Sequence, residues 1–238
     1  MAETSNGYRL ILFDIDGTLL SAGAIARESV LRALETAYGW RPAEKHHDRK
    51  RFDFSGKTDP QIVRELVREE IGDDRCERDL SRALALYLEE LERGLKPENV
   101  VPKPGVAELL ATLATRPDVT LALLTGNLER GARLKLEPPG FNRYFPFGAF
   151  GSDSADRYAL PAIALERAAE RTGRRFGGKS IVVVGDSVHD VACGRSLGVR
   201  SVAVATGPTR ADQLAAERPD ALLSDFSDVR RALEAILA

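Results

Sequence analysis

The sequence predicts an α/β protein with a parallel sheet and a helical block inserted after the first strand. Short apolar runs alternate with helical patterns along most of the chain, which is typical of strands joined by helical crossovers. The runs are almost continuously apolar, as expected of strands buried on both faces of a sheet. Residues 21–98, in contrast, contain helical patterns and no strong strand.

The expected elements follow one another from residue 8 onward. Strands are predicted at residues 8–13, 119–124, 147–150, 181–184, 201–205 and 221–223. Helices are predicted between these strands at residues 106–114, 128–136, 160–172 and 188–197, and in the inserted block at residues 24–38, 60–70 and 77–93. We therefore expect a core of residues 1–20 and 99–238 and a small helical cap domain of residues 21–98.

The composition excludes several classes of protein. The 238 residues carry 34 basic and 36 acidic side chains, a near balance that argues against a nucleic-acid binder. No apolar stretch is long enough to span a membrane, and the polar N-terminus lacks the features of a signal peptide. The two cysteines and three histidines show neither zinc-site nor disulfide spacing, so we expect a reducing, cytoplasmic location.

Acidic residues follow two of the predicted strands at their carboxyl ends, where open α/β sheets bind ligands. Asp14 and Asp16 follow the first strand, and in an extended chain their side chains leave the same face. Asp186 and Asp190 follow the strand at residues 181–184. Carboxylates this close repel one another unless a cation intervenes, and oxygen ligands suit Mg²⁺. A plain turn at Asp16 or a helix cap at Asp186 would explain either motif alone, so their placement together predicts the magnesium site.

A second polar group lies where the strand at residues 119–124 meets the next helix. It consists of Thr125, Gly126 and Asn127. Backbone N–H groups at such a junction bind anions, and the threonine hydroxyl adds a donor. We predict that these residues contact an anionic substrate, although a helix cap is the simpler interpretation.

These motifs resemble those of the haloacid dehalogenase superfamily, in the phosphatase branch with a helical C1-type cap. The first motif is Phe13-Asp14-Ile15-Asp16-Gly17-Thr18-Leu19, the second is Leu123-Leu124-Thr125-Gly126-Asn127, and the fourth is Val184-Gly185-Asp186 with Asp190. The resemblance covers nearly the whole chain and is nearest to phosphoglycolate-phosphatase-like proteins. It implies a Rossmann-like core, Mg²⁺ as the cofactor, and phosphoryl transfer through an aspartyl-phosphate.

The resemblance also implies a role for each matching residue. Asp14 would be the nucleophile and a metal ligand. Asp16 would protonate the leaving oxygen and then deprotonate the attacking water, and its backbone carbonyl would bind the metal. Asp186 would bind Mg²⁺, with Asp190 as a direct or water-mediated partner, and Thr125 would hold the phosphoryl oxygens. An acid at position 16 favours phosphate esters over carbon–halogen bonds, because only an alkoxide leaving group needs a proton.

The family's third motif supplies a lysine that has no direct counterpart here, since no lysine occurs between Lys135 and Lys179. We expect Arg157 to take its place and to contact both Asp14 and the phosphate, although a surface arginine is the simpler interpretation. Lys135 is the rival, but it lies well along the helix at residues 128–136 and is expected to face solvent.

The cap supplies two further candidates for substrate contact. Lys57 lies in a loop before the helix start at Asp59 and Pro60, and is predicted to contact an anionic group. The basic run at residues 41–51 could attract anions, although a solvated charged face is the simpler interpretation. His189 lies inside the fourth motif and is expected to be a bystander.

The sequence therefore favours a Mg²⁺-dependent phosphomonoester hydrolase that acts on a small soluble phosphate ester. A phosphomutase of the same superfamily shares every motif and stays open as the alternative. A non-catalytic phosphate-binding module is disfavoured because the nucleophile, acid and metal residues are all present, and a haloacid dehalogenase is disfavoured by Asp16. No nucleic acid or membrane partner is expected, and both a monomer and a homodimer are compatible with the sequence.

Overall fold

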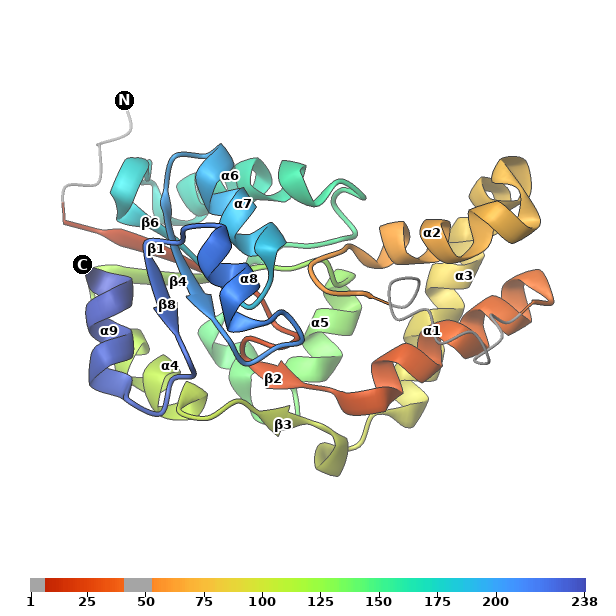
Figure 1. Cartoon of the computed structure of the whole chain (residues 1–238), viewed down its shortest axis with the longest axis horizontal. Helices are drawn as coiled ribbons and strands as arrows, with labels where there is room; N and C mark the ends of the chain where they lie inside the picture. Colours follow the sequence, from red (N-terminus) through yellow and green to blue (C-terminus); the bar gives the residue numbers. More distant parts are fainter. Residues whose placement is uncertain (1–6, 41–52) are drawn as a thin grey trace.

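The computed structural model describes residues 7–40 and 53–238. Its core is a six-stranded parallel sheet in the order β5-β4-β1-β6-β7-β8 (Figure 1). The strands are β1 (Arg9–Phe13), β4 (Val119–Leu124), β5 (Gly148–Ala149), β6 (Ile181–Gly185), β7 (Arg200–Val204) and β8 (Ala221–Leu223). The predicted α/β fold with a parallel sheet is confirmed.

Helices cover both faces of this sheet (Figure 1). They are α4 (Val106–Ala114), α5 (Glu129–Leu136), α6 (Leu160–Thr172), α7 (Val188–Ser196), α8 (Ala211–Ala216) and α9 (Val229–Leu237). Successive residues of β1 point to opposite faces, so Ile11 and Phe13 join one hydrophobic cluster while Leu10 and Leu12 join another. Burial on both faces explains why the strand is a continuous apolar run.

In its described residues, 21–40 and 53–98, the inserted block consists mainly of three helices that lie beside the sheet (Figure 1). They are α1 (Gly23–Tyr38), α2 (Asp59–Ile71) and α3 (Asp73–Gly94). Their apolar side chains pack into a cluster of their own, which includes Leu34, Val67 and Leu91. This cluster also takes in Leu128 and the partly buried Leu134, which belong to the region of α5. The block is therefore packed directly against α5 of the core.

A short antiparallel pair, β2 (Leu20–Ser21) and β3 (Val101–Pro102), joins the block to the core. Leu20 pairs with Pro102 and Ser21 with Val101, close to the predicted boundaries at residues 20 and 99. The division into core and cap stays a prediction, which the separate packing of the three helices supports.

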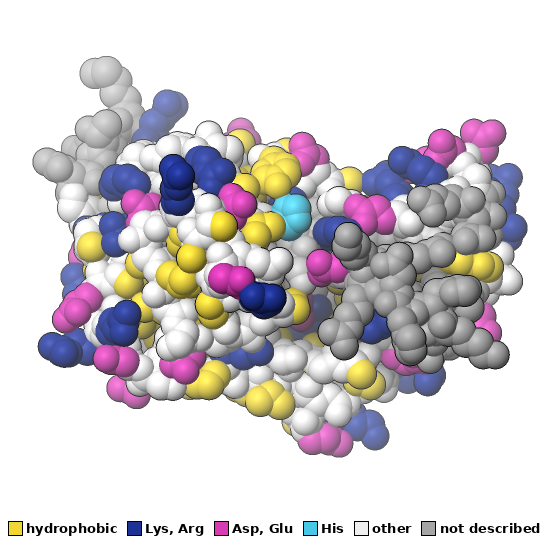
Figure 2. Space-filling model, viewed as in Figure 1, with side chains coloured by type: hydrophobic (Ala, Val, Ile, Leu, Met, Phe, Trp, Pro, Cys, Tyr) yellow, Lys and Arg dark blue, Asp and Glu magenta, His cyan; other side chains and the backbone are white. Residues whose placement is uncertain are grey.

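The surface carries charges of both signs. Basic and acidic side chains are interspersed over the face shown in Figure 2, as the near balance of charge predicts. In the part of the chain that the structure describes, no helix is long and apolar enough to cross a membrane.

Candidate active site

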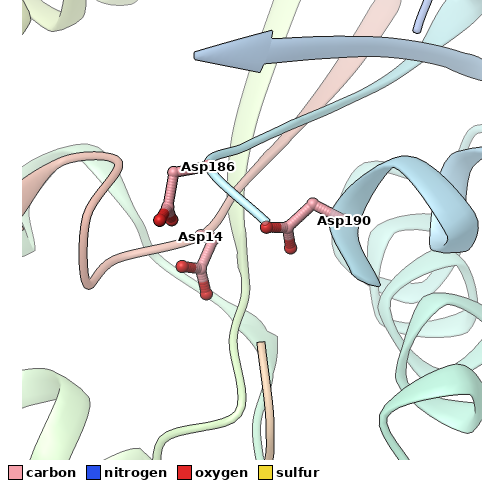
Figure 3. A group of neighbouring side chains, drawn as sticks. All are labelled: Asp14, Asp186 and Asp190. Carbon is pink, nitrogen blue, oxygen red and sulfur yellow. The ribbon is translucent and has the colours of Figure 1, made fainter. Parts of the chain in front are cut away.

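Three carboxylates converge at the carboxyl edge of the sheet (Figure 3). Asp14 follows β1, Asp186 follows β6, and Asp190 lies in the first turn of α7. One carboxylate oxygen from each residue lies within 4.8 Å of the other two, and all three residues are buried. Because β1 and β6 are parallel neighbours, their carboxyl ends bring the side chains together at one edge. The structure thus assembles three of the four predicted metal ligands.

This crowding of carboxylates is unfavourable without a cation. Burial and the neighbouring Asp190 charge raise the pKa of Asp14 to about 7, although Arg157 opposes the rise. Burial, followed by repulsion from Asp14 and Asp190, also raises the pKa of Asp186. A divalent cation between these groups would relieve the repulsion, and three carboxylates form the hard oxygen donor set that Mg²⁺ prefers. The residues present therefore fit such an ion.

Two glycines leave room for the Asp186 carboxylate. A Cβ atom at Gly17 would lie 2.4 Å from Asp186 Oδ2, and a Cβ atom at Gly207 would lie 1.6 Å from the same oxygen. Gly17 also has a φ of +89°, a backbone conformation that other residues adopt only with strain. Thr18 then donates its hydroxyl to Asp186 Oδ1 at 3.0 Å. The turn within the first motif thus holds one ligand of the candidate metal site.

Arg157 brings a positive charge to the same cluster. It begins a short 3₁₀ helix (Arg157–Ala159) and is 3% exposed, so it is not a surface arginine. Its Nη2 atom donates to Asp14 Oδ1 at 3.3 Å and also to Asp190 Oδ1. Burial acts to lower the guanidinium pKa, but the Asp190 and Asp14 charges outweigh this effect and raise it. The structure places Arg157 against Asp14 as expected, and its contact with a phosphate stays a prediction.

Asp16 makes a different set of contacts. Lys135 Nζ donates to Asp16 Oδ2 at 2.6 Å and to Asn127 Oδ1 at 2.5 Å. Asn127 Nδ2 donates to the same Asp16 Oδ2 at 2.7 Å. Asp16 is thus held by a lysine and an amide, whereas Asp14 lies beside an arginine and two carboxylates.

The expectation that Lys135 faces solvent is wrong. Its side chain is only 4% exposed. The helix that carries it, α5, lies between the sheet and the cap helix α3. A Cβ atom at Gly131 of α5 would lie 3.3 Å from Leu88 of α3, which shows how closely the two helices approach. The sequence alone does not show that α3 packs over α5. From the sequence, α5 is therefore expected to have one face in solvent.

The second motif lies against the start of α2 in the inserted block. Thr125 is fully buried at the end of β4, and its hydroxyl oxygen accepts a hydrogen bond from Asn127 Nδ2 at 2.9 Å. The carbonyl of Gly126 accepts from the backbone N–H of Asp59 at 2.8 Å. A Cβ atom at Gly126 would lie only 2.0 Å from the carbonyl oxygen of Lys57, so glycine permits this close approach.

The inserted block and the sheet edge line an open cavity of about 1050 Å³ over these residues. Lys57 lines it, but its ammonium group is paired with Glu65 of α2, and its contact with substrate stays a prediction. His189 packs against Gly56 and hydrogen-bonds the Tyr158 hydroxyl at 2.9 Å. The basic run at residues 41–51 lies outside the described residues. The core residues that line the cavity include Asp14, Asp16, Thr125, Gly126, Asn127, Lys135, Arg157 and Asp186.

A parallel sheet that gathers carboxylates at its strand ends, beneath a block of helices, defines an α/β enzyme of the kind that binds a metal and an anionic substrate together. A comparison of the sequence with models of protein families identifies the family of this chain. The model of the haloacid dehalogenase-like hydrolases matches residues 8–198, and the chain belongs to that family. The resemblance expected from the motifs is confirmed.

Named relatives match the chain over almost its whole length. The phosphoglycolate phosphatase of Synechococcus elongatus is 27% identical over 229 residues, which cover 95% of this chain and 98% of the relative. The crystal structure of a predicted phosphoglycolate phosphatase from Haemophilus somnus has a TM-score of 0.72 at 21% identity, covering 95% and 98% of the two chains. A putative beta-phosphoglucomutase from Thermotoga maritima has a TM-score of 0.61 at 22% identity, with the same coverage. At these identities, the solved structures show a shared fold.

Proposed function

We propose that this chain is a phosphatase that hydrolyses small phosphomonoesters with Mg²⁺, through an aspartyl-phosphate. One observation carries the proposal. Asp14 lies beside two further buried carboxylates and Arg157, whereas Asp16 is hydrogen-bonded by other residues. Two carboxyl groups in different electrostatic surroundings suit two different tasks, nucleophilic attack and proton transfer.

Asp14 and Asp186 would hold the metal, together with the backbone carbonyl of Asp16. Asp190 Oδ2 already accepts from the backbone N–H and the hydroxyl of Ser187, at 3.0 and 2.6 Å, and its Oδ1 accepts from the arginine. These contacts favour a water-mediated role for Asp190. When bound, the ion would shield the carboxylates from the negative phosphoryl group and stabilise the charge of the transition state.

The protein groups then divide the hydrolysis into two steps. An oxygen of Asp14 attacks phosphorus, the bond to the ester oxygen breaks, and the Asp16 carboxyl gives its proton to that oxygen. In the second step the Asp16 carboxylate takes a proton from water as the water oxygen attacks phosphorus, which releases phosphate and restores Asp14. The Thr125 hydroxyl and the backbone N–H groups of Gly126 and Asn127 would hold the phosphoryl oxygens.

Two further features extend the proposal to substrate and location. The relatives named phosphoglycolate phosphatase favour a small anionic ester, and the contact of the cap loop with Gly126 favours a substrate enclosed between the domains. Cys76 and Cys193 are both free and buried, in line with a cytoplasmic location.

The test is phosphate release from a panel of phosphomonoesters, measured with Mg²⁺ and with EDTA. Asp14→Asn removes the nucleophile at nearly constant shape, and Asp212→Asn, an exposed aspartate on α8, is the matched control. Release that requires both Mg²⁺ and Asp14 would support the proposal. Interconversion of sugar phosphate isomers without net release would favour the phosphomutase instead, and turnover by Asp14→Asn would contradict both.

A further inference from the structure

Asp16 is held through one carboxylate oxygen only. Its Oδ2 atom accepts from Lys135 Nζ at 2.6 Å and from Asn127 Nδ2 at 2.7 Å. Among residues 7–40 and 53–238, none donates a hydrogen bond to Oδ1. The Asp16 side chain is 40% exposed and lines the cavity, whereas the Lys135 side chain is buried behind it. Oδ1 is therefore the oxygen that is available to a substrate.

Lys135 is itself held from several sides. It donates to Asn127 Oδ1 at 2.5 Å, and Asn127 is fixed in turn by donating to Thr125 Oγ1 at 2.9 Å. The buried carboxyl of Asp59, from the inserted block, is near enough to feel the charge of this ammonium group. Burial raises the pKa of Asp59 to about 6, and the charge of Lys135 opposes that rise. The charge of one buried lysine thus pairs with Asp16 and also lowers the pKa of Asp59.

We propose that Lys135 is a positioning residue for the proton transfer. Together with Asn127 it occupies Oδ2 of Asp16 and confines the acid proton to Oδ1. An oxygen that already accepts two N–H donors has no room for a proton of its own. The inference rests on the proposed function, in which the proton leaves Asp16 for the ester oxygen as the phosphorus–oxygen bond breaks, and returns to the same carboxyl oxygen from water.

The two possible roles of Lys135, positioning Asp16 or binding the phosphoryl group, predict different losses of kcat/KM for different esters. An alkyl phosphate releases an alkoxide that needs the proton, whereas p-nitrophenyl phosphate releases a stable phenolate that departs without it. The ratio kcat/KM reports only the steps up to the release of the alcohol. A lysine that binds the phosphoryl group would affect both esters alike, because they share that group.

The experiment compares kcat/KM for these two esters in Lys135→Gln. We expect a loss of about 10²-fold with the alkyl ester, because misplacing a general acid forfeits most of its contribution, and little change with p-nitrophenyl phosphate. Asp16→Asn provides the reference. Its loss of kcat/KM should differ between the two esters at least as strongly as that of Lys135→Gln. Lys103→Gln is the matched control, because Lys103 lines the same cavity but donates to the Thr206 carbonyl at 2.7 Å. Its ratio between the esters should stay at the wild-type value.

A second variant guards against a failure to fold. Asn127→Ala removes the other donor to Asp16 without leaving a charge unpaired, and should shift the ratio in the same direction. If thermal unfolding shows that Lys135→Gln does not fold, Asn127→Ala decides the question. Equal losses with both esters in a folded variant would overturn the positioning role. Turnover by Asp14→Asn would instead overturn the proposed function, so the two failures are distinguishable.

Discussion

Replacing Asp59 by asparagine should stabilise the protein at neutral pH. Asp59 is the first residue of α2 and is 7% exposed, and its Oδ2 accepts from the backbone N–H of Leu128 at 2.8 Å. Burial raises its pKa from 3.8 to about 6 despite the nearby Lys135. At about 1.4 kcal/mol for each pKa unit, ionised Asp59 costs about 3 kcal/mol of unfolding free energy. The positive end of the helix dipole offsets up to about 1 kcal/mol, which leaves about 2 kcal/mol.

The direction of the pH dependence follows from the raised pKa, because the folded state binds the proton of Asp59 more tightly than the unfolded state does. The favourable contribution of protonated Asp59 is fully present below pH 3.8 and is lost as the pH rises through about 6. Asparagine keeps an oxygen for the Leu128 N–H and carries no charge at any pH. The stability gain of Asp59→Asn should therefore be full above about pH 7, and should shrink as the pH falls from 6 to 4.

The assay is urea unfolding of both proteins at pH 8, 6 and 4.5, without divalent cations. Asp228→Asn is the matched control, because Asp228 is exposed and accepts from the backbone N–H of Arg231 at 3.0 Å at the start of α9. Its free energy of unfolding should change by less than about 0.5 kcal/mol. A loss of stability in Asp59→Asn at pH 8, or a gain that does not depend on pH, would refute the reasoning.

Three further predictions concern the charges and the close contacts of the site. Arg157→Met should lower the free energy of unfolding by about 3–5 kcal/mol without Mg²⁺, because two buried carboxylates lose their shared cation; urea unfolding checks this, and an unchanged midpoint would contradict it. Asp186→Asn should raise the Tm in EDTA, since it removes one of three crowded carboxylates, and should abolish the Tm increase that Mg²⁺ gives the wild type; an intact Mg²⁺ response would count against Asp186 as a ligand. Gly126→Ala should lower kcat/KM, because its Cβ would force the carbonyl of Lys57 away from the site, whereas Gly177→Ala, with no atom within 4 Å of its Cβ, should not.

The parallel sheet could be predicted because burial on two faces leaves a strong sequence signal. Each of the six predicted apolar runs overlaps one of the strands β1 and β4–β8. The pair β2 and β3 was not predicted, since each strand has only two residues and shows no pattern. The short helix α8 and the terminal helix α9 also went unpredicted.

The candidate site was predictable wherever a residue follows a strand end. Asp14 and Asp186 follow the ends of two parallel strands, and the pairing of β1 with β6 in the sheet brings them together. The burial of Lys135 could not be predicted, because it depends on the tertiary packing of α5. It lies between Leu134 and Leu136 in a helix that the cap covers. The sequence signal for its burial is weak: a charged residue flanked by two leucines in a short helix.

The antiparallel pairing of β2 with β3 brings the two ends of the helical block together at one place on the core. Leu20 and Pro102 face each other across two strands, so their Cα atoms lie about 5 Å apart, and a turn of a few residues could close the core without the block. Asp14, Asp16 and Asp186 all lie outside the excised segment. An exchange of residues 21–101 as one piece would therefore leave these acids in place and would replace the side of the cavity that the block lines.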